Sequence, residues 1–523
     1  MADVEVVGVR EAVSSPAELF DIAGVVRSPD GVLRYQDLPT SVVEMFRDSV
    51  DRDPSAEALV EPGGPRLSYR RLWDRASHLA GGLVAEGVTP GDRVAIELPN
   101  GVDWCVAFLG TLLAGAVAVP VNTRFTAAER DYVVGDAGAR IRIRPDAPLP
   151  DGPAHVHEDH RPTDAATIFY TSGTTGFPKG AVNTHENLVA TTENSRRARQ
   201  LPVGEIRDLI SVPLFHVTGC HSQFLTTLDL GGTSVILPKF EVQAFLRAIE
   251  AEEVNKMTSV PAIYWLALNQ DNVDDFDLTA VRWVTYGGAP CPPRLARRIA
   301  EHFASARIGN GYGLTETSSI ATFLPHEYAI TRAATVGAPV PVDELALAEV
   351  DPDTGVGELL IRGQNVVDGY WGNAEATAAA IVDGWLHTGD LARLDDDGFC
   401  EIVDRAKDMI NRGGENVYCL EVEHVLVNHP AVFEAAVVGV PDEVMGEKVG
   451  AVVVPQPGAS PAAAELAAFV GEHLADYKVP EYVVVRAEAL PRNPGGKILK
   501  PALRDDTGWE QVPRRAGGGR PRS

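Results

Sequence analysis

An eleven-residue segment at residues 170–180 contains the residue types that bind a polyphosphate. It reads Tyr-Thr-Ser-Gly-Thr-Thr-Gly-Phe-Pro-Lys-Gly and follows a short apolar run, Ala165 to Phe169, that is typical of the end of a buried strand. Glycines let backbone N–H groups approach phosphate oxygens, hydroxyl groups donate hydrogen bonds, and the lysine supplies a cation. The segment therefore predicts a phosphate-binding loop. Its predicted contact residues are Thr171, Ser172, Gly173, Thr174, Thr175, Gly176 and Lys179.

Two other interpretations of this segment are weaker. The classical nucleotide loop G-x-x-x-x-G-K-[ST], counted from Gly173, needs a glycine where Pro178 stands and a metal-binding hydroxyl where Gly180 stands. A Gly/Thr-rich surface turn is the plainer alternative, but eleven consecutive residues in one pattern disfavour it. Phosphate binding without the classical loop is the prediction that remains.

A second segment, Gly311-Tyr-Gly-Leu-Thr-Glu316, lies downstream. Glycines beside an aromatic ring suit a nucleobase that stacks close to the backbone. Thr315 is suited to hydrogen-bond an α-phosphate, and the Glu316 carboxylate is an oxygen ligand suited to Mg²⁺. Taken alone the segment is no more than a β-turn, because it does not complete a dinucleotide fingerprint.

Four further segments share the order of a known family. They are Tyr286-Gly-Gly-Ala289, Thr388-Gly-Asp390, Asp404-Arg-Ala-Lys-Asp408 and Pro491-Arg-Asn-Pro-Gly-Gly-Lys497-Ile-Leu-Lys500. With the two segments above, they resemble the adenylate-forming superfamily, which contains acyl-CoA synthetases, luciferases and peptide-synthetase adenylation domains. The resemblance covers about residues 40 to 505. As single residues, Asp390 is also explained as a turn residue, and Lys407 and Lys497 as solvated charges.

The resemblance implies an α/β fold, with a large N-terminal domain of layered α/β subdomains and a small mobile α+β C-terminal domain. It implies two half-reactions: an acid and ATP give an acyl-adenylate and pyrophosphate, and a thiol then displaces AMP. Lys497 is expected to contact both the substrate carboxylate and the α-phosphate, where a desolvated ammonium stabilises the two approaching anions most in the transition state. Lys407 is expected to be the pivot on which the small domain turns.

The resemblance also assigns the remaining site residues. Catalytic roles fall on Lys497, Glu316, Thr315 and His216. The ATP and AMP contacts beyond the loop are Gly287, Gly288, Ala289, Asn310, Gly311, Tyr312, Gly313, Asp390 and Arg405, with Asp390 and Arg405 on the ribose. Mg²⁺ is expected on Glu316 with Thr171 nearby, and CoA on Gly413, Gly414 and Glu415. ATP, Mg²⁺ and CoA are thus the expected cofactor and co-substrates.

Residues 215 and 216 bear on which acid is used. Peptide-synthetase domains carry an aspartate after the phenylalanine, where this chain has His216, and this disfavours an α-amino acid. A histidine there resembles acyl- and aryl-CoA ligases. Zinc binding by His216, Cys220 and His221 is a weak alternative, since a fourth ligand is lacking.

The segment at residues 413–418 resembles fatty-acyl and related CoA ligases, with two departures. Cys419 stands where proline is usual, and Asn411 and Arg412 stand where smaller residues or lysine are common. The main hypothesis is an acid:CoA ligase for a fatty, aryl or alicyclic acid. The alternatives are an adenylating enzyme that passes the acid to a carrier-protein thiol, an amine or an inorganic nucleophile, and a nucleotide-binding scaffold without turnover.

The elements that must position these residues alternate between strands and helices, which predicts layers with largely parallel sheets. A helix-capping box is predicted at Ser41 to Glu44. Strands are predicted at 94–98, 117–121, 209–212, 234–237, 283–286, 435–440 and 449–454, and helices at 244–253 and 293–303. Arg196, Arg197 and Arg199 are expected on a solvated helix face, with CoA phosphate or acidic lipid docking as the alternative.

Length and composition limit what can be expected of the domains, the partners and the redox environment. A chain of 523 residues is too long for one core. The predicted divisions are an N-terminal extension (1–38), an AMP-binding domain (39–403), a hinge (404–408), a C-terminal domain (409–510) and a disordered basic tail (511–523). The net charge of −27 argues against nucleic acid as a partner, and five scattered cysteines favour a reduced cytoplasmic protein.

The segment Trp104 to Val121 is the one membrane candidate in the sequence. It is rich in Ala and Gly and contains Pro120, so a buried helix that runs into a strand is expected in place of a membrane span. Peripheral membrane contact stays open. The expected assembly is a monomer or a homodimer, and the expected partners are a carboxylic acid, ATP and CoA.

Overall fold

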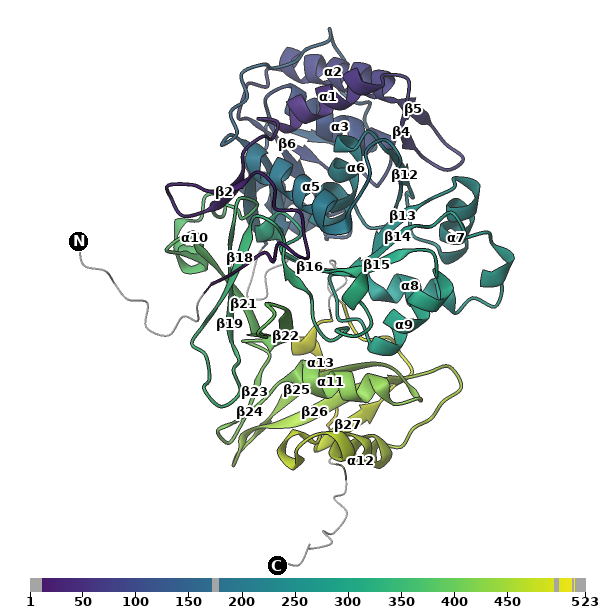
Figure 1. The fold of residues 1–523 in the computed structure, drawn as a ribbon, viewed down its shortest axis with the longest axis vertical. Coiled ribbons are helices and arrows are strands. Elements are labelled where there is room, and N and C mark those ends of the chain that lie inside the picture. The colour runs from purple at the N-terminus through teal and green to yellow at the C-terminus, as the bar shows by residue number, and fades with distance from the viewer. Residues whose placement is uncertain (1–11, 172–177, 493–497, 510–511, 513–523) are drawn as a thin grey trace, which may run out of the picture. The chain divides into compact units, whose positions relative to one another are not determined.

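The computed structural model describes residues 12–171, 178–492, 498–509 and 512 (Figure 1). The chain forms two compact units. The larger comprises Met1–Ala348, Leu360–Thr388 and Leu394–Glu401, and the smaller comprises Glu349–Leu359, Gly389–Arg393 and Ile402–Ser523. Both contain sheets and helices, which confirms the predicted α/β class.

The larger unit contains a sheet in the order β17-β16-β15-β14-β13-β11-β12-β4-β5. From β15 to β4 its neighbours are parallel, as predicted, and its two edges are antiparallel. The strands are β4 (Glu57–Val60), β5 (Arg66–Ser68), β11 (Arg207–Ile210), β12 (Thr233–Ile236), β13 (Lys256–Ser259), β14 (Trp283–Gly287), β15 (Arg307–Tyr312), β16 (Thr322–Leu324) and β17 (Ala338–Pro339).

A second sheet of the larger unit has the order β10-β9-β7-β6-β8. Its strands are β6 (Arg93–Ile96), β7 (Val117–Pro120), β8 (Ile141–Ile143), β9 (Ala165–Thr171) and β10 (Lys179–Thr184). Strand β9 lies parallel to β7 and antiparallel to β10. The predicted phosphate-binding segment therefore begins at the end of strand β9 and finishes at the start of β10.

The remaining strands of the first 405 residues form a third sheet and a small hairpin. The third sheet has the order β1-β18-β19-β21-β20, with β22 beside β21. Its strands are β1 (Val13–Ser14), β18 (Asp343–Ala348), β19 (Gly357–Gly363), β20 (Ile381–Val382), β21 (Trp385–Leu394) and β22 (Cys400–Arg405). The hairpin is β2 (Val25–Arg27) and β3 (Leu33–Tyr35).

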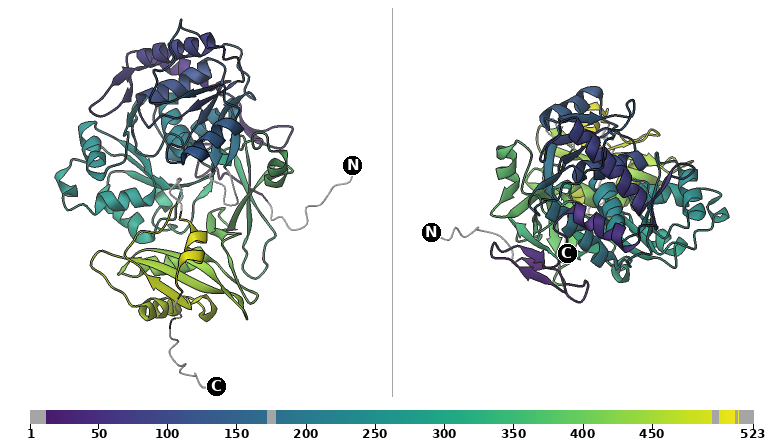
Figure 2. Two further views of the ribbon diagram at one scale, coloured as in Figure 1. Left: turned by 180° about the vertical axis from the view of Figure 1, so that it is seen from behind. Right: turned by 90° about the horizontal axis from the view of Figure 1, so that it is seen from above.

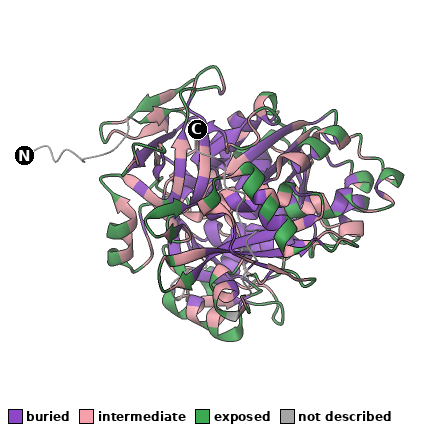
Figure 3. Cartoon of the chain, turned by 90° about the horizontal axis from the view of Figure 1, so that it is seen from below, coloured by how far each residue is buried: buried purple, intermediate pink, exposed green. Residues whose placement is uncertain are grey.

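Helices α1, α2 and α3 pack against one another and share a large apolar core with strands of the first two sheets (Figure 1). The helices of the larger unit are α1 (Val42–Arg52), α2 (Tyr69–Ala85), α3 (Val102–Leu113), α4 (Ala127–Asp136), α5 (His185–Arg199), η1 (Thr218–Leu225), α6 (Thr226–Asp229), α7 (Val242–Ala251), α8 (Pro261–Leu268), η2 (Val273–Asp275), α9 (Pro293–His302), η3 (Thr315–Thr317), η4 (His326–Tyr328) and α10 (Ala374–Ala380). In Figure 3 the buried residues are purple, and many of them lie in the strands.

Helix α1 begins where the capping box predicts, but one half of the box differs. The Ser41 hydroxyl accepts a hydrogen bond from the Glu44 N–H at 3.1 Å. The Glu44 carboxylate, however, accepts from the N–H of Thr40 at 2.6 Å and not from Ser41. The side chain reaches one residue further back because Thr40 also offers its hydroxyl to the same oxygen.

Two predictions about buried and exposed helices have opposite outcomes. The segment Trp104 to Val121 is a buried helix, α3, that leads into β7, as predicted. No helix among the described residues is long and apolar enough to cross a membrane. The solvated face predicted on α5 is wrong for Arg199, which is 5% exposed. Its guanidinium lies against the β14 and η1 side chains Thr285 and Ser222, and burial lowers the pKa of Arg199 to about 10.

From Ile410 onward the smaller unit is built on one sheet with helices on both faces. The sheet has the order β24-β23-β26-β25, with β27 beside β26. Its strands are β23 (Ile410–Arg412), β24 (Glu415–Val417), β25 (Val432–Asp442), β26 (Gly446–Pro455) and β27 (Tyr482–Val485); its helices are α11 (Cys419–Asn428), α12 (Ala463–His473), η5 (Asp476–Lys478) and α13 (Lys500–Asp506). Side chains of α11 and α12 pack on one face, and Leu503 of α13 packs on the other. In the left view of Figure 2, the ribbon of α13, in yellow, lies in front of this sheet.

Candidate active site

The two ends of the predicted phosphate-binding segment lie in the hairpin of β9 and β10. Thr171 and Lys179 are partners in the register of the hairpin, and the Thr171 hydroxyl donates to the Lys179 carbonyl at 3.4 Å. The side chain of Lys179 is exposed, with its ammonium 5.3 Å from the centre of the Tyr370 ring. The predicted contacts Ser172, Gly173, Thr174, Thr175 and Gly176 lie outside the described residues.

The predicted nucleotide contacts 287–289 and 310–313 meet at the carboxyl ends of two parallel strands. Gly287 of β14 is the register partner of Gly311 of β15. A Cβ at Gly287 would lie 2.2 Å from the Gly311 carbonyl oxygen, so only glycine fits there. Gly288 follows with φ +71°, and Ala289 is exposed. Such strand ends are where open α/β sheets bind ligands.

Thr315 and Glu316 lie on the short helix η3, which leads into a turn of unusual backbone. Ser318 and Ser319 have φ values of 55° and 139°, in the left-handed region that favours glycine. Gly313 precedes the turn, and a Cβ there would lie 1.7 Å from the Ser319 carbonyl oxygen. We call residues 315–319 the serine turn.

Buried side chains hold the serine turn in this conformation. The Asn365 amide donates to the carbonyls of Thr317 and Ile320, both at 3.0 Å. The Ser318 hydroxyl donates to the Asn365 carbonyl at 2.7 Å and accepts from the amide of Asn183 at 2.8 Å. These partners are fully buried, so each hydrogen bond would be costly to lose.

His216 lies just before the π-helix η1, where it is half-buried. Its N–H donates to the Pro213 carbonyl, and its own carbonyl accepts from Cys220. Among the described residues no group of three His, Cys, Asp or Glu side chains is arranged to hold a metal ion.

His221, one turn further along η1, joins η1 to the serine turn. It is fully buried, and its Nδ1–H donates to the Ser318 carbonyl at 2.8 Å. Burial lowers the pKa of His221 to about 4. His221 is therefore neutral at pH 7, where it supports the turn as a hydrogen-bond donor.

Tyr370 connects two of the predicted site residues. Its hydroxyl donates to Oε1 of Glu316 at 2.7 Å, and its ring lies beneath the Lys179 ammonium. Nothing in the local sequence marks this residue beyond an aromatic side chain after Gly369. The structure thus brings Thr171, Lys179 and Glu316 to one place in the larger unit.

Asp390, Arg405 and Lys407 belong to the smaller unit. Asp390 is 6% exposed, and its carboxylate lies 3.6 Å from the Arg405 guanidinium. The N–H of Ala406 donates to the Gly389 carbonyl at 3.0 Å, which ties the predicted hinge to the segment that carries Asp390. Burial lowers the pKa of Lys407. Lys497 lies outside the described residues.

Gly413 and Gly414 form the turn between β23 and β24, with φ values of 62° and 95°. The Gly413 N–H donates to the Met445 carbonyl, and the Gly414 N–H donates to the Asn411 side chain at 2.9 Å. Glu415 is exposed. We call residues 411–415 the glycine turn.

The departure at Cys419 has a structural consequence. Its N–H donates to the Asp404 carboxylate, and its thiol donates to the Asp408 carbonyl at 3.0 Å. A proline there would have no N–H to give. Cys419 therefore binds both ends of the predicted hinge segment to helix α11.

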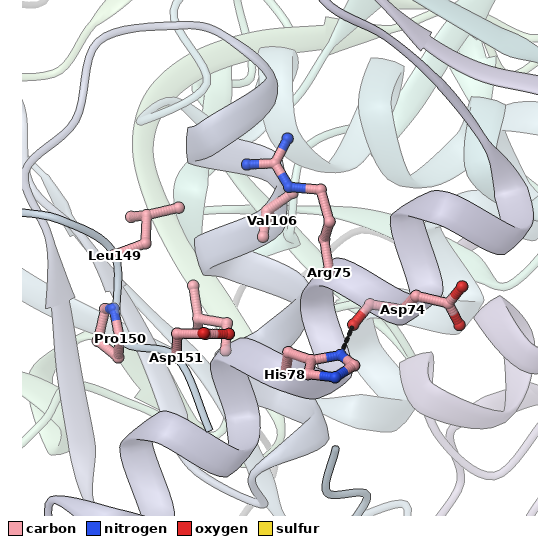
Figure 4. Close-up of a pocket in the computed structure, with 8 residues that line it drawn as sticks. Asp74, Arg75, His78, Val106, Leu149, Pro150 and Asp151 are labelled. Atoms are coloured by element: carbon pink, nitrogen blue, oxygen red, sulfur yellow. Dashed lines mark hydrogen bonds between the residues drawn. The ribbon is translucent and has the colours of Figure 1, made fainter. Parts of the chain in front are cut away.

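A pocket of about 280 Å³ opens elsewhere in the larger unit, between α2, α3 and residues 149–151 (Figure 4). Its polar lining includes Arg75 and His78, but His78 is bonded to the Asp74 carbonyl of its own helix at 2.7 Å and Arg75 is paired with Asp103. No predicted site residue lines this pocket.

Comparison with known proteins identifies the family of this chain. The profile of the AMP-binding enzyme matches residues 46–155 and 143–371, and the profile of the AMP-binding enzyme C-terminal domain matches residues 421–497. The chain belongs to the AMP-binding enzyme family.

Relatives of this AMP-binding enzyme match over nearly their whole length. It is 38% identical to a feruloyl-CoA synthase of Amycolatopsis, over 86% of this chain and 96% of the relative. It is 34% identical to a long-chain-fatty-acid–CoA ligase of Mycobacterium tuberculosis, over 88% and 97%. The solved structure of o-succinylbenzoate CoA synthetase from Bacillus subtilis, in complex with ATP and magnesium ion, superposes with a TM-score of 0.79 at 30% identity, over 88% of this chain and 99% of that one.

These matches confirm the resemblance to adenylate-forming enzymes and the architecture of a large N-terminal and a small C-terminal domain. The chemistry of Glu316 also fits its predicted role as a Mg²⁺ ligand. Mg²⁺ in nucleotide sites is bound by one or two carboxylates and by substrate phosphates, so a single carboxylate is enough. Only Oε1 of Glu316 is engaged within the described part of the chain, which leaves Oε2 for a cation.

Proposed function

We propose that this AMP-binding enzyme is an ATP-dependent acid:CoA ligase that activates a fatty, aryl or alicyclic carboxylic acid. One observation carries the proposal: relatives that match over nearly their whole length are named as enzymes that form CoA thioesters. The contacts among Lys179, Tyr370 and Glu316 agree with it, since they gather a cation and a carboxylate beside the hairpin that carries the phosphate-binding segment.

The first half-reaction forms an acyl-adenylate. A carboxylate oxygen of the acid attacks the α-phosphorus of ATP, and the bond from that phosphorus to the leaving pyrophosphate breaks. The loop residues at 171–176 and Lys179 would bind the phosphates, and Thr315 would hydrogen-bond the α-phosphate. Mg²⁺ bound at Glu316, with Thr171 nearby, would supply positive charge against the pyrophosphate oxygens.

The other proposed contacts orient the nucleotide. Residues 287–289 and 310–313 would border the adenine, and Asp390 and Arg405 would bind the ribose. Lys497 would neutralise the carboxylate and the α-phosphate as they meet, where a charge contact counts most in the transition state.

The second half-reaction forms the thioester. The sulfur of CoA attacks the carbonyl carbon of the acyl-adenylate, and AMP leaves. We assign the thiol contacts to Gly413, Gly414 and Glu415, and the change between the two half-reactions to a turn about Lys407 in the 404–408 hinge between domains 39–403 and 409–510. The His216 side chain would line the acid side of the site.

The acceptor is tested by AMP release. A panel of carboxylic acids of graded length and shape is assayed with and without CoA. The proposal expects AMP release that depends on both the acid and CoA, with acyl-CoA as product. Pyrophosphate release with the acid alone, with no increase on adding CoA, would show that the acceptor is not CoA. The acceptor would then be a carrier-protein thiol, an amine or an inorganic nucleophile.

The role of Lys497 is tested separately. The change Lys497→Ala is expected to lower acyl-adenylate formation by roughly 10²–10³, as the loss of one transition-state charge contact does, while thioester formation from supplied acyl-adenylate persists. Lys478→Ala is the control, because Lys478 is paired with Glu421 in the same unit. Adenylation that survives in Lys497→Ala would show that this lysine has another role.

A further inference from the structure

Tyr370 stands between the two charged side chains of the candidate site. Its hydroxyl donates to Oε1 of Glu316 at 2.7 Å, and the Lys179 ammonium lies 5.3 Å from the centre of its ring. A hydrogen bond to a carboxylate is among the stronger ones in proteins, and a lysine over an aromatic face is attracted by the negative face of the ring. One side chain thus restrains both an anion and a cation.

The backbone around Tyr370 is fixed from two sides. The N–H of Trp371 donates to the Gly180 carbonyl at 2.7 Å, and the N–H of Val182 donates to the Gly369 carbonyl at 3.1 Å. These bonds align Tyr370 with strand β10, which begins at Lys179. On the other side, the N–H of Val367 donates to the Glu316 carbonyl at 2.9 Å. The segment 367–371 therefore holds the main chain of Glu316 as well as its side chain.

The chemistry of this pair limits what Tyr370 can do. A tyrosine phenol keeps its proton at neutral pH and a carboxylate only accepts, so the Tyr370 hydroxyl is the donor in this pair. The donor occupies one carboxylate oxygen and fixes the plane of the carboxylate. Donors that hold a metal ligand in this way set its orientation, and their loss typically costs about 10–100-fold in metal affinity or activity.

We propose that Tyr370 is a positioning residue of the nucleotide site: its hydroxyl fixes Glu316 so that Oε2 faces the cation that accompanies ATP, and its ring holds Lys179 toward the phosphates. The proposal rests on the proposed function, because it takes Glu316 as a ligand of Mg²⁺. It extends that function by a residue that reaches the substrate only through Glu316 and Lys179.

Two substitutions separate the two contacts of Tyr370. Tyr370→Phe removes the hydroxyl and keeps the ring beneath Lys179, whereas Tyr370→Leu removes both. Tyr35 offers a matched control: it is buried, its hydroxyl donates to Asn194 Oδ1 at 2.7 Å, and its ring lies 4.6 Å from the Arg197 guanidinium carbon. Tyr35→Phe loses the same kind of hydrogen bond without touching Glu316.

The decisive readout is cation binding. Mn²⁺ is titrated into the protein with a non-hydrolysable ATP analogue, and free Mn²⁺ is followed by electron paramagnetic resonance. Tyr370→Phe is expected to raise the Kd for Mn²⁺ about tenfold. In the adenylation assay the half-saturating Mg²⁺ concentration should rise by a similar factor, with kcat at saturating Mg²⁺ within about threefold of wild type. Tyr370→Leu should add a two- to fivefold rise in KM for ATP, as expected for a lost cation–π contact.

A double-mutant cycle guards against a merely structural effect. In a Glu316→Gln background, Tyr370→Phe should cause no further loss of Mn²⁺ affinity, because the carboxylate it orients is gone. Additive losses, or Mn²⁺ affinity unchanged in Tyr370→Phe, would overturn the positioning role. So would an equal loss in Tyr35→Phe. If the wild-type enzyme itself released no AMP from any acid, the proposed function would fail instead, and the two failures are thereby told apart.

Discussion

The serine turn and the glycine turn reverse the chain with the same kind of backbone but by different means. Ser318 and Ser319 adopt positive φ values in the first, and Gly413 and Gly414 do so in the second. For a residue with a side chain this conformation costs about 1–2 kcal/mol, whereas glycine adopts it freely. The serine turn must therefore be held in place by its surroundings.

Those surroundings differ as expected. The serine turn is bonded to the buried side chains of Asn365, Asn183 and His221. The glycine turn is bonded to the Met445 carbonyl and to the side chain of Asn411, and a Cβ at Gly414 would meet open space. A rigid turn suits the proposed role of Glu316, in which its carboxylate meets a cation in one geometry. An open glycine turn suits close approach of a substrate to the backbone. Three predictions test this contrast.

The largest effect is expected from Asn365→Ala. The change leaves the buried carbonyls of Thr317 and Ile320 without a donor, and one such group costs about 1–3 kcal/mol, so the free energy of unfolding should fall by about 3 kcal/mol. Urea denaturation followed by tryptophan fluorescence measures the loss. The half-saturating Mg²⁺ concentration for adenylation should rise as well, because the turn no longer holds Glu316.

Asn255→Ala is the control for this prediction. The Asn255 amide donates to the Glu205 carbonyl at 2.7 Å and its oxygen accepts from the Arg207 N–H at 2.9 Å, both away from the serine turn. It should lower stability with no effect on the Mg²⁺ dependence. Unchanged Mg²⁺ dependence in Asn365→Ala would show that the network serves stability alone.

A smaller effect is expected from pH. His221 has a pKa of about 4 in the folded protein and about 6.5 when unfolded. Its contribution to stability is therefore complete above about pH 6.5 and is lost as the pH falls toward 4, because the unfolded state binds the proton first. Between pH 7 and pH 5 this loss is about 2 kcal/mol. His221→Gln should remove that part of the pH dependence of the urea midpoint.

His185 is the matched group elsewhere in the larger unit, since burial lowers its pKa to about 3. His185→Gln should reduce the pH dependence in the same way and leave the Mg²⁺ dependence of adenylation unchanged. The glycine turn donates to the Met445 carbonyl and to the Asn411 side chain, and neither group is ionisable. A wild-type pH dependence in His221→Gln would mean that His221 is not the group that couples the serine turn to pH.

Local patterns indicate candidate site residues where those residues are neighbours in sequence. The predicted phosphate-binding segment, the glycine pairs and Glu316 stand in short runs whose composition indicates the proposed chemistry. The ends of the predicted strands lie within about three residues of the observed ends for the same reason; β7 begins at Val117 as predicted, and helix α9 begins at Pro293 as predicted.

What the sequence did not reveal depends on contacts between distant residues. Tyr370 and Glu316 are 54 positions apart, and His221 and Ser318 are 97 apart. Nothing in the local sequence of Tyr370 or His221 indicates these contacts, because each depends on a residue far away in the chain. The prediction for Arg199 was wrong for the same reason. Three arginines at the end of a helix indicate a solvated face, and only the fold reveals that Arg199 packs against Thr285 and Ser222.

The smallest effect on stability is expected in the glycine turn itself. Gly414→Ala places a side chain at φ 95° in open space, so backbone strain alone should lower the free energy of unfolding by about 1 kcal/mol. Gly458 is a matched control in the same unit, because its φ is 80° and a Cβ there would meet no atom within 4 Å, so Gly458→Ala should cost the same.

Only Gly414→Ala should slow thioester formation from supplied acyl-adenylate, because only that turn is assigned to the thiol. Adenylate formation should stay at the wild-type rate in both variants. Equal rates of thioester formation in the two variants would remove the functional half of the contrast and leave the glycine turn as a simple chain reversal.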